Sequence, residues 1–267
     1  MPIAGRVLSL YSTLAYPQYT TTYVRTDANT CGSDGGAFYL DGTGHICILD
    51  SGGGWIDATT WKFIFGHEMG HRVSDANDGP LGGGYNIDPR ISSLCQCSYV
   101  DNFGGDAHCM QSREAAQSAQ SEGFAHFFST AIFNDRSENN GVYVYPKESL
   151  KASSLGYLII DPPTAFDAYL KSGSDNNQWM EHKCNPGDVD QGVELDWLHF
   201  YFELWTSGAN EWSIDEMFDI WSDTTGNYGW NNGSNGIMDI VNSQMGSGSD
   251  KRNLFYNTGI ASGVDHG

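Results

Sequence analysis

The residues best suited to chemistry in this chain are two histidines that flank a glutamate. His67, Glu68 and His71 form the pattern H-E-x-x-H in a segment with helical spacing of apolar residues. Residues four apart lie on one face of a helix, about one turn from each other, so two imidazoles at this spacing can bind a single zinc ion. The glutamate between them can reach a water on that ion and act as a general base. The alternative interpretation is a surface helix with ordinary polar residues.

A catalytic zinc site also needs a third protein ligand and one open position. One known pattern places a histidine or aspartate six residues after the second histidine, with a glycine between, but Asn77 and Ser74 stand at those positions. In a second pattern a glutamate comes from a separate downstream helix. Glu122 fits this pattern, and Glu114 is the weaker candidate. A third pattern uses an upstream cysteine, but the glycine-rich loop that accompanies it has no counterpart here.

These residues need two helices to position them. The sequence predicts a first helix at about Ala58–Ser74, with Asp57 as its N-cap, and a second at about Ser112–Asn134, which would carry Glu122. Short strands are expected before the first helix and more helices after the second. The predicted strands are Arg6–Tyr11, Thr20–Arg25, Gly36–Leu40 and His45–Leu49, and the later helices are Thr164–Lys171, Gly192–Thr206, Ile214–Ser222 and Asn235–Gln244. Helices segregated from a small sheet predict an α+β fold.

Charge and composition exclude several classes of protein. The chain has 267 residues, with 13 Lys+Arg against 33 Asp+Glu and a formal net charge of −20. Such a chain repels phosphate and anionic lipid surfaces, so we expect no nucleic-acid partner and no membrane association. Aromatic residues make up 13% and charged residues only 17%, which argues for a folded core and against disorder. The expected state is a monomer.

The cysteines bear on the compartment. An even count of six predicts an oxidising environment and up to three disulfides. Cys31 and Cys47 flank a predicted hairpin, and we expect them to pair. Buried free thiols are the alternative, and a structural zinc on Cys95, Cys97 and Cys109 is disfavoured by the C-x-C spacing. The first residues lack the apolar segment of a signal peptide, so we expect a mature portion behind an added start methionine, from a secreted or extracytoplasmic protein.

The chain resembles the gluzincin zinc peptidases, in the broad thermolysin-like and fungalysin-like sense. Three segments carry the resemblance in the same order: a strand and hairpin at 37–49, the zinc-binding helix at 66–71, and a second-helix motif at 121–128. The resemblance implies a zincin-like fold, with a small twisted N-terminal sheet, an active-site helix and a mainly α-helical C-terminal lobe. It implies a zinc endopeptidase in which one Zn²⁺ is held by His67, His71 and Glu122, with Glu68 as general base.

The implied domain organisation is a single two-lobed catalytic domain that covers residues 1–267. The upper lobe, 1–75, would contain the sheet and the H-E-x-x-H helix. Residues 76–111 would form a cysteine-rich insertion, and residues 112–267 the helical lower lobe. Oxygen-rich segments at 75–78 and 188–194 could bind Ca²⁺, but neither matches an EF-hand loop, so solvated turns are favoured.

One position departs from the family pattern. An aspartate commonly follows the third ligand by four residues and holds a zinc-binding histidine, whereas this chain has His126. Either His126 forms a different hydrogen bond, or another acid such as Asp75 or Asp196 holds the histidine. His126 could also approach the metal itself, since it shares a helix face with Glu122.

The resemblance also implies a donor from the C-terminal lobe that stabilises the oxyanion formed during hydrolysis. His199 and Tyr201 are the candidates, and His182 is a poorer one. For His199 a core or capping role is the favoured interpretation, and the donor role is a hypothesis. The tryptophans of the C-terminal half are interpreted as core residues rather than a carbohydrate platform.

The expected function is therefore a secreted zinc endopeptidase that acts on a peptide or protein substrate. Two alternatives stay open. The first is a zinc amidase that cleaves a peptide-like cell-wall bond, and the second is a non-catalytic binding module that contains zinc. An intact Glu68 argues against the second, because a structural zinc site has no use for a base.

Overall fold

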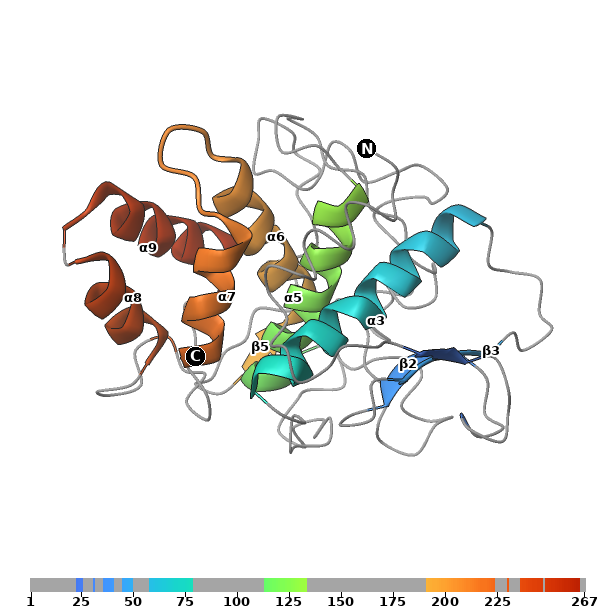
Figure 1. Ribbon diagram of the computed structural model, residues 1–267. Coiled ribbons are helices and arrows are strands. Elements are labelled where there is room, and N and C mark those ends of the chain that lie inside the picture. Colours follow the sequence, from blue (N-terminus) through green and yellow to red (C-terminus); the bar gives the residue numbers. More distant parts are fainter. Residues whose placement is uncertain are drawn as a thin grey trace.

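The computed structural model shows an α+β protein whose site is built from successive layers (Figure 1). It describes residues 23–25, 31, 36–40, 45–49, 58–78, 113–133, 191–223, 230, 236–246 and 248–264. Within them the elements are, in chain order, β1 (Tyr23–Arg25), β2 (Gly36–Leu40), β3 (His45–Leu49), α3 (Ala58–Asp78), β4 (Arg113–Ala115), α5 (Ala116–Phe133), β5 (Gln191–Val193), α6 (Glu194–Thr206), α7 (Ile214–Asp223), α8 (Ile237–Met245) and α9 (Asp250–Ser262).

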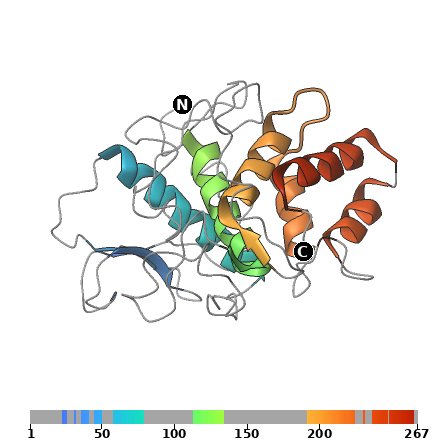
Figure 2. The same ribbon diagram turned by 180° about the vertical axis from the view of Figure 1, so that it is seen from behind.

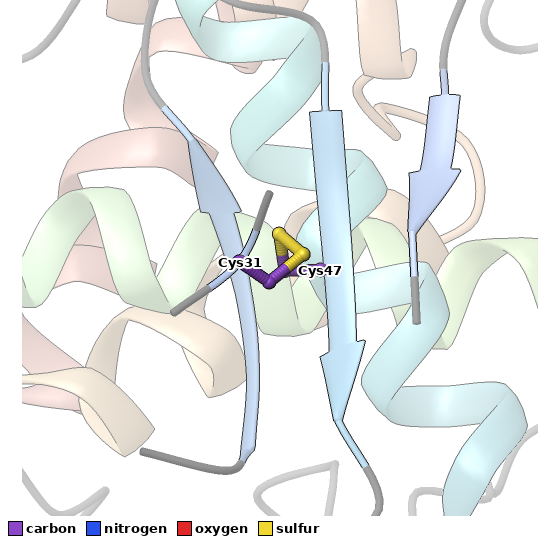
Figure 3. Close-up of a disulfide and its surroundings, with 2 residues drawn as sticks. All are labelled: Cys31 and Cys47. Atoms are coloured by element: carbon purple, nitrogen blue, oxygen red, sulfur yellow. A yellow bond between two sulfur atoms is a disulfide. The ribbon is translucent and has the colours of Figure 1, made fainter. Parts of the chain in front are cut away.

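The first sheet has β3 at its centre. Strand β1 pairs with β3 in parallel, and β2 pairs with it antiparallel, with Phe38 opposite Cys47. The predicted disulfide between Cys31 and Cys47 is confirmed, with an S–S distance of 2.08 Å, and it ties the segment before β2 to the central strand (Figure 3). Both cysteines are buried.

The helices follow the sheet in layers. Strands β2 and β3 pack against α3, α3 packs against α5, α5 against α6, and α6 against α9, as the two opposite views show (Figures 1 and 2). Helices α7 and α8 complete the C-terminal group beside α9. Helix α5 thus lies in the middle of the stack, with α3 on one side and α6 on the other. None of the described helices combines the length and apolar character that crossing a membrane requires.

A short second sheet sets the starting points of the two inner helices. Strands β4 and β5 pair antiparallel, with Glu114 opposite Gly192, and each strand leads directly into a helix, α5 or α6. Because the strands are hydrogen-bonded to each other, the first turns of these helices are held side by side. This pairing joins segments that are far apart in the sequence.

Aromatic side chains fill the interface between α6 and the C-terminal helices. Phe200 on α6 meets Phe255 on α9 with ring centroids 4.8 Å apart, and Trp230 stacks on Phe255 at 5.4 Å. The interpretation of the tryptophans as core residues is confirmed for Trp197, Trp205, Trp212 and Trp230, all of which are buried. The C-terminal group therefore supports α6 on the side opposite α5.

Four details of the sequence prediction are corrected by the structure. Helix α5 begins at Ala116, so Glu114 lies in strand β4 and not two turns before Glu122 on one helix. Residues 75–78 form the last turn of α3, not a solvated turn. Residues 191–193 are strand β5, and the helix expected from Gly192 begins at Glu194. Helix α9 was not anticipated. The expected elements Arg6–Tyr11 and Thr164–Lys171 and the cysteines after Cys47 lie outside the described residues.

Candidate metal centre

The two histidines of the H-E-x-x-H pattern meet on one face of α3. The Nε2 atoms of His67 and His71 lie 3.0 Å apart, and their rings are nearly perpendicular. The helix makes this possible because positions four apart are stacked one turn above the other. His67 is almost fully buried, whereas the side chain of His71 is 11% exposed. The pair therefore opens toward solvent on the His71 side.

Glu122 brings a carboxylate to this pair from α5. Its Oε2 atom lies 3.0 Å from His67 Nε2 and 3.1 Å from His71 Nε2. Together with the distance between the two nitrogens, these contacts make a nearly equilateral triangle of donor atoms. The side chain of Glu122 is only 1% exposed. The three residues expected to bind one metal ion are thus brought together from two helices, α3 and α5.

Glycines allow the two helices to approach closely enough for this contact. A Cβ atom on Gly70 would lie 2.6 Å from Cα of Ala125, and one on Gly66 would lie 2.7 Å from Oγ of Ser129. Both distances are shorter than side chains tolerate, so α3 presents bare backbone to α5 at two successive turns. Ser129 also donates a hydrogen bond to the carbonyl of Phe63, at 2.7 Å. Gly66 and Gly70 thus allow α3 to lie close enough to α5 for the two histidines to contact Glu122.

A third glycine sets the contact between α5 and α6. A Cβ atom on Gly123 would lie 2.2 Å from Cβ of Trp197 and 2.9 Å from the carbonyl oxygen of Glu194. The residue next to Glu122 is therefore pressed against the first turn of α6. This contact sets the position of Glu122 relative to the first turn of α6.

Burial favours the neutral, metal-binding form of the histidine side chains. Desolvation lowers the pKa of His67, the neighbouring His71 lowers it further, and Glu122 and Glu194 oppose the shift. Metal ions bind the neutral imidazole, so a lowered pKa keeps His67 ready to ligate at neutral pH.

The donor set fits a zinc ion. Tetrahedral zinc with Zn–N bonds of about 2.0–2.1 Å places its ligand atoms about 3.3–3.4 Å apart. The distances of 3.0–3.1 Å in the triangle are within a few tenths of an ångström of that separation. Two imidazoles and one carboxylate are also the ligand set of several catalytic zinc sites, which leave a fourth position for water or substrate.

Glu68 lies on α3 between the two histidines of the triangle in sequence. It directly follows His67, and it is 4% exposed in a helix whose other buried residues include Met69 and Arg72. Its carboxylate therefore belongs to the enclosed side of α3. A buried carboxylate directly after His67 agrees with the role of a base next to a metal.

His126 and Glu194 form a second buried acid–histidine contact next to the triangle. His126 Nε2 lies 3.0 Å from Glu194 Oε2, and both side chains are 1% exposed. The His126 ring faces that of His67 at a centroid distance of 4.1 Å and an angle of 34°. Burial and the nearby His67 lower the pKa of His126 to about 4, against the opposing effect of Glu194. His126 therefore forms a hydrogen bond different from that of the family's aspartate, with Glu194 as its partner.

Glu194 was missed by sequence reasoning, which placed it in an oxygen-rich turn. The structure puts it at the first position of α6, fully buried. No local pattern marks it, because its partner His126 is 68 residues away. The only signal was its place at a predicted helix start that carries two acids, Glu194 and Asp196, which are ordinarily interpreted as favourable to the helix dipole.

Ligand atoms of three of these buried residues gather closely enough to hold an ion. One such atom from each of His67, Glu122 and His126 lies within 4.8 Å of the others. This group shares two members with the triangle. His126 thus borders the same site rather than a separate one.

The candidates for an oxyanion donor lie on α6. His199 is buried, with its Nε2 atom 3.7 Å from Glu203 Oε1, in an i,i+4 pair. Tyr201 is buried among aromatic rings, and its hydroxyl accepts a hydrogen bond from Gln120 at 3.4 Å. Burial raises the pKa of Tyr201. Asp196 is buried too, and His182 lies outside the described residues.

Comparison with known proteins gives no match, whether with family models, curated proteins or solved structures.

Proposed function

We propose that this chain is a zinc-dependent endopeptidase of the gluzincin type, with a zincin-like arrangement of sheet, active-site helix and helical C-terminal lobe. The observation that carries the proposal is the triangle of His67 Nε2, His71 Nε2 and Glu122 Oε2, with sides of 3.0–3.1 Å. Its members come from two of the three segments that carry the resemblance, residues 66–71 and 121–128. Its donor atoms are also the ones that zinc prefers.

The chemistry divides between the ion and the chain. When bound, zinc supplies a Lewis acid that polarises a peptide carbonyl and makes water more acidic. His67, His71 and Glu122 hold the site, and Glu68 is proposed to accept a proton from the attacking water. Glu68 then donates that proton to the leaving amine, so that the carboxylate is restored after each cycle. His199 stays a proposed donor to the developing oxyanion.

Two features support an extracytoplasmic location. The disulfide between Cys31 and Cys47 is buried in the sheet that packs against α3, and disulfides persist mainly in oxidising compartments. The net charge of −20 favours solubility and opposes association, because molecules of like charge repel each other. We propose a peptide or protein substrate for a secreted monomer.

The test of the proposed function is Glu68→Gln. This substitution keeps the size of the side chain but removes its ability to accept a proton. We expect cleavage of a fluorescently labelled unfolded protein to fall by about 10²- to 10⁴-fold, the usual contribution of a general base. The bound zinc, measured by elemental analysis, should stay at one ion per chain, because Glu68 is not a ligand.

Glu211→Gln is a matched control, since Glu211 lies in the connection between α6 and α7. It should leave both activity and zinc content unchanged. Full activity of Glu68→Gln would contradict the mechanism. Cleavage of cell-wall amide bonds without cleavage of unfolded proteins would instead identify an amidase with the same centre.

A further inference from the structure

His126 occupies the position that the family pattern gives to an aspartate, yet it makes a contact of another kind. It follows Glu122 by one helical turn on α5, so both side chains project toward α3. Its ring lies over the ring of His67, with centroids 4.1 Å apart. A flat ring that packs against the His67 imidazole limits the rotation of that imidazole about the side-chain bonds of His67.

Glu194 fixes His126 from the opposite side. Its Oε2 atom lies 3.0 Å from His126 Nε2, and it belongs to the first turn of α6. That turn cannot shift easily, because Gly123 leaves no room between α5 and the Glu194 carbonyl. The orientation of the His126 ring is thus determined by two helices at once.

The same contact directs Nε2 of His126 to Glu194, although a ligand atom of His126 lies within 4.8 Å of those of His67 and Glu122. The triangle of His67, His71 and Glu122 is complete without His126. A residue that touches a ligand ring but points its nitrogen elsewhere is suited to orient the ligand.

We propose that His126 and Glu194 act as a positioning pair, in which the His126 ring fixes the plane of the His67 imidazole and Glu194 anchors that ring to α6. The proposal rests on the proposed zinc site. It adds a link between the metal site and the C-terminal helices, because α6 is held in turn by α9. Residues that support metal ligands in this way commonly affect the affinity for the ion.

The test measures zinc affinity by competition with a chromophoric chelator, using the full chain with zinc first removed. His126→Phe keeps a flat ring but cannot bond to Glu194, and Glu194→Leu removes the acceptor. We expect each to raise the zinc dissociation constant about 10- to 100-fold. Glu194→Gln keeps an oxygen that accepts the hydrogen bond, and its dissociation constant should stay within about 3-fold of the wild type.

A double variant separates positioning from stability. Because Glu194 is proposed to act only through His126, His126→Phe with Glu194→Leu should bind zinc no more weakly than the weaker single variant. This pair also avoids a buried carboxylate without its partner, so it keeps the test valid if a single variant fails to fold. Ile132→Val, a buried change further along α5, is the control that lowers stability without changing zinc affinity.

The outcomes distinguish this proposal from the proposed function. If the wild type binds one zinc ion, and His126→Phe, Glu194→Leu and the double variant bind it equally well, the proposed positioning pair is wrong and the zinc site stands. The pair is also wrong if the visible spectrum of the cobalt-substituted protein shows that His126→Phe loses an inner ligand, since His126 would then be a ligand itself. If the wild type binds no zinc, both proposals fall.

Discussion

One oxygen atom connects the two halves of the candidate centre. Oε2 of Glu122 lies within hydrogen-bond distance of a nitrogen on each histidine of α3, although 51 residues separate it from His71. The histidines could be predicted from sequence because their spacing is a local property of one helix. Glu122 could be predicted because of the motif around it. Glu194 could not, since its role depends on a contact between two helices that no local pattern encodes.

Glu216 offers a test of electrostatics at the scale of a single residue. The backbone N–H of Ser213 donates to its Oε2 atom at 2.8 Å, and its own N–H donates to Ser213 Oγ at 3.1 Å, which is a capping box at the start of α7. Lys251 of α9 donates to the same carboxylate, at 2.7 Å from Oε2. Partial burial acts to raise the pKa of Glu216, but the hydrogen bonds from Lys251 and Ser213 outweigh it and lower the pKa.

A lowered pKa means that ionised Glu216 stabilises the folded state. This stability is fully present above the unfolded pKa of about 4.3 and is lost as the pH falls through the folded value. We expect Glu216→Gln, which keeps the capping box, to cost about 0.5–1 kcal/mol at pH 7, since the pair is partly exposed and screened. Thermal unfolding should show this difference shrink when the pH is lowered from 7 to below the unfolded value of about 4.3. An equal difference at both pH values would show that the charge is not responsible.

At the scale of elements, backbone contact decides the distance between α3 and α5. The Cβ of an alanine at position 70 would meet the Cα of Ala125, whereas one at position 66 would first meet the flexible end of Ser129. Backbone cannot rotate away as a hydroxyl can. The two glycines are therefore expected to differ in their tolerance of substitution.

We predict that Gly70→Ala destabilises the fold by about 1–3 kcal/mol, the usual cost of overpacking, despite the better helix propensity of alanine. Gly66→Ala should cost less, and Ser129→Gly in the same chain should restore part of the loss by removing the clashing side chain. Chemical denaturation measures both. Equal stability of Gly70→Ala and the wild type would mean that α3 and α5 are not in backbone contact.

The elements that sequence reasoning missed are those decided by distant contacts. The helices expected from Ser112 and from Gly192 would include residues 113–115 and 192–193. In the structure, residues 113–115 and 191–193 instead pair with each other as β4 and β5. Tertiary pairing overrides local preference in such short segments. Helix α9 has a mixed polar sequence, and its real signals were the cap at Ser249, which accepts from the Arg252 N–H, and the left-handed Gly263.

At the scale of the whole molecule, the excess of acid has a local cost. Asp215, Asp219 and Asp223 follow one another at intervals of one turn along α7, and all three are exposed. Partial burial raises the pKa of Asp219, and the charges of Asp215 and Asp223 raise it further. A raised pKa means that the ionised carboxylate destabilises the folded state at neutral pH, and that this cost is relieved at acid pH.

We expect Asp219→Asn to stabilise the protein by about 0.5 kcal/mol at low salt. The substitution removes the charge at position 219, which is repelled by the like charges of Asp215 and Asp223 at i,i+4 spacing. In 1 M salt, where the Debye length is about 3 Å, most of this gain should vanish. Thermal unfolding at the two salt concentrations measures it. Asp239→Asn should show no such gain, since an acid in the first turn of α8 is favoured by the helix dipole. A gain independent of salt would contradict the electrostatic origin.

The close packing of α3, α5 and α6 also defines how related chains could be recognised. Side chains are excluded at Gly70 and Gly123 and are crowded by Ser129 at Gly66, so a homologue with the same centre is expected to keep these glycines as well as its ligands. The signature is G-H-E-x-G-H, followed at a variable distance by E-G-x-x-H and later by a glutamate that begins a helix. Such a pattern specifies the spacing between helices as well as the chemistry, and it separates this arrangement from chains in which H-E-x-x-H occurs by chance.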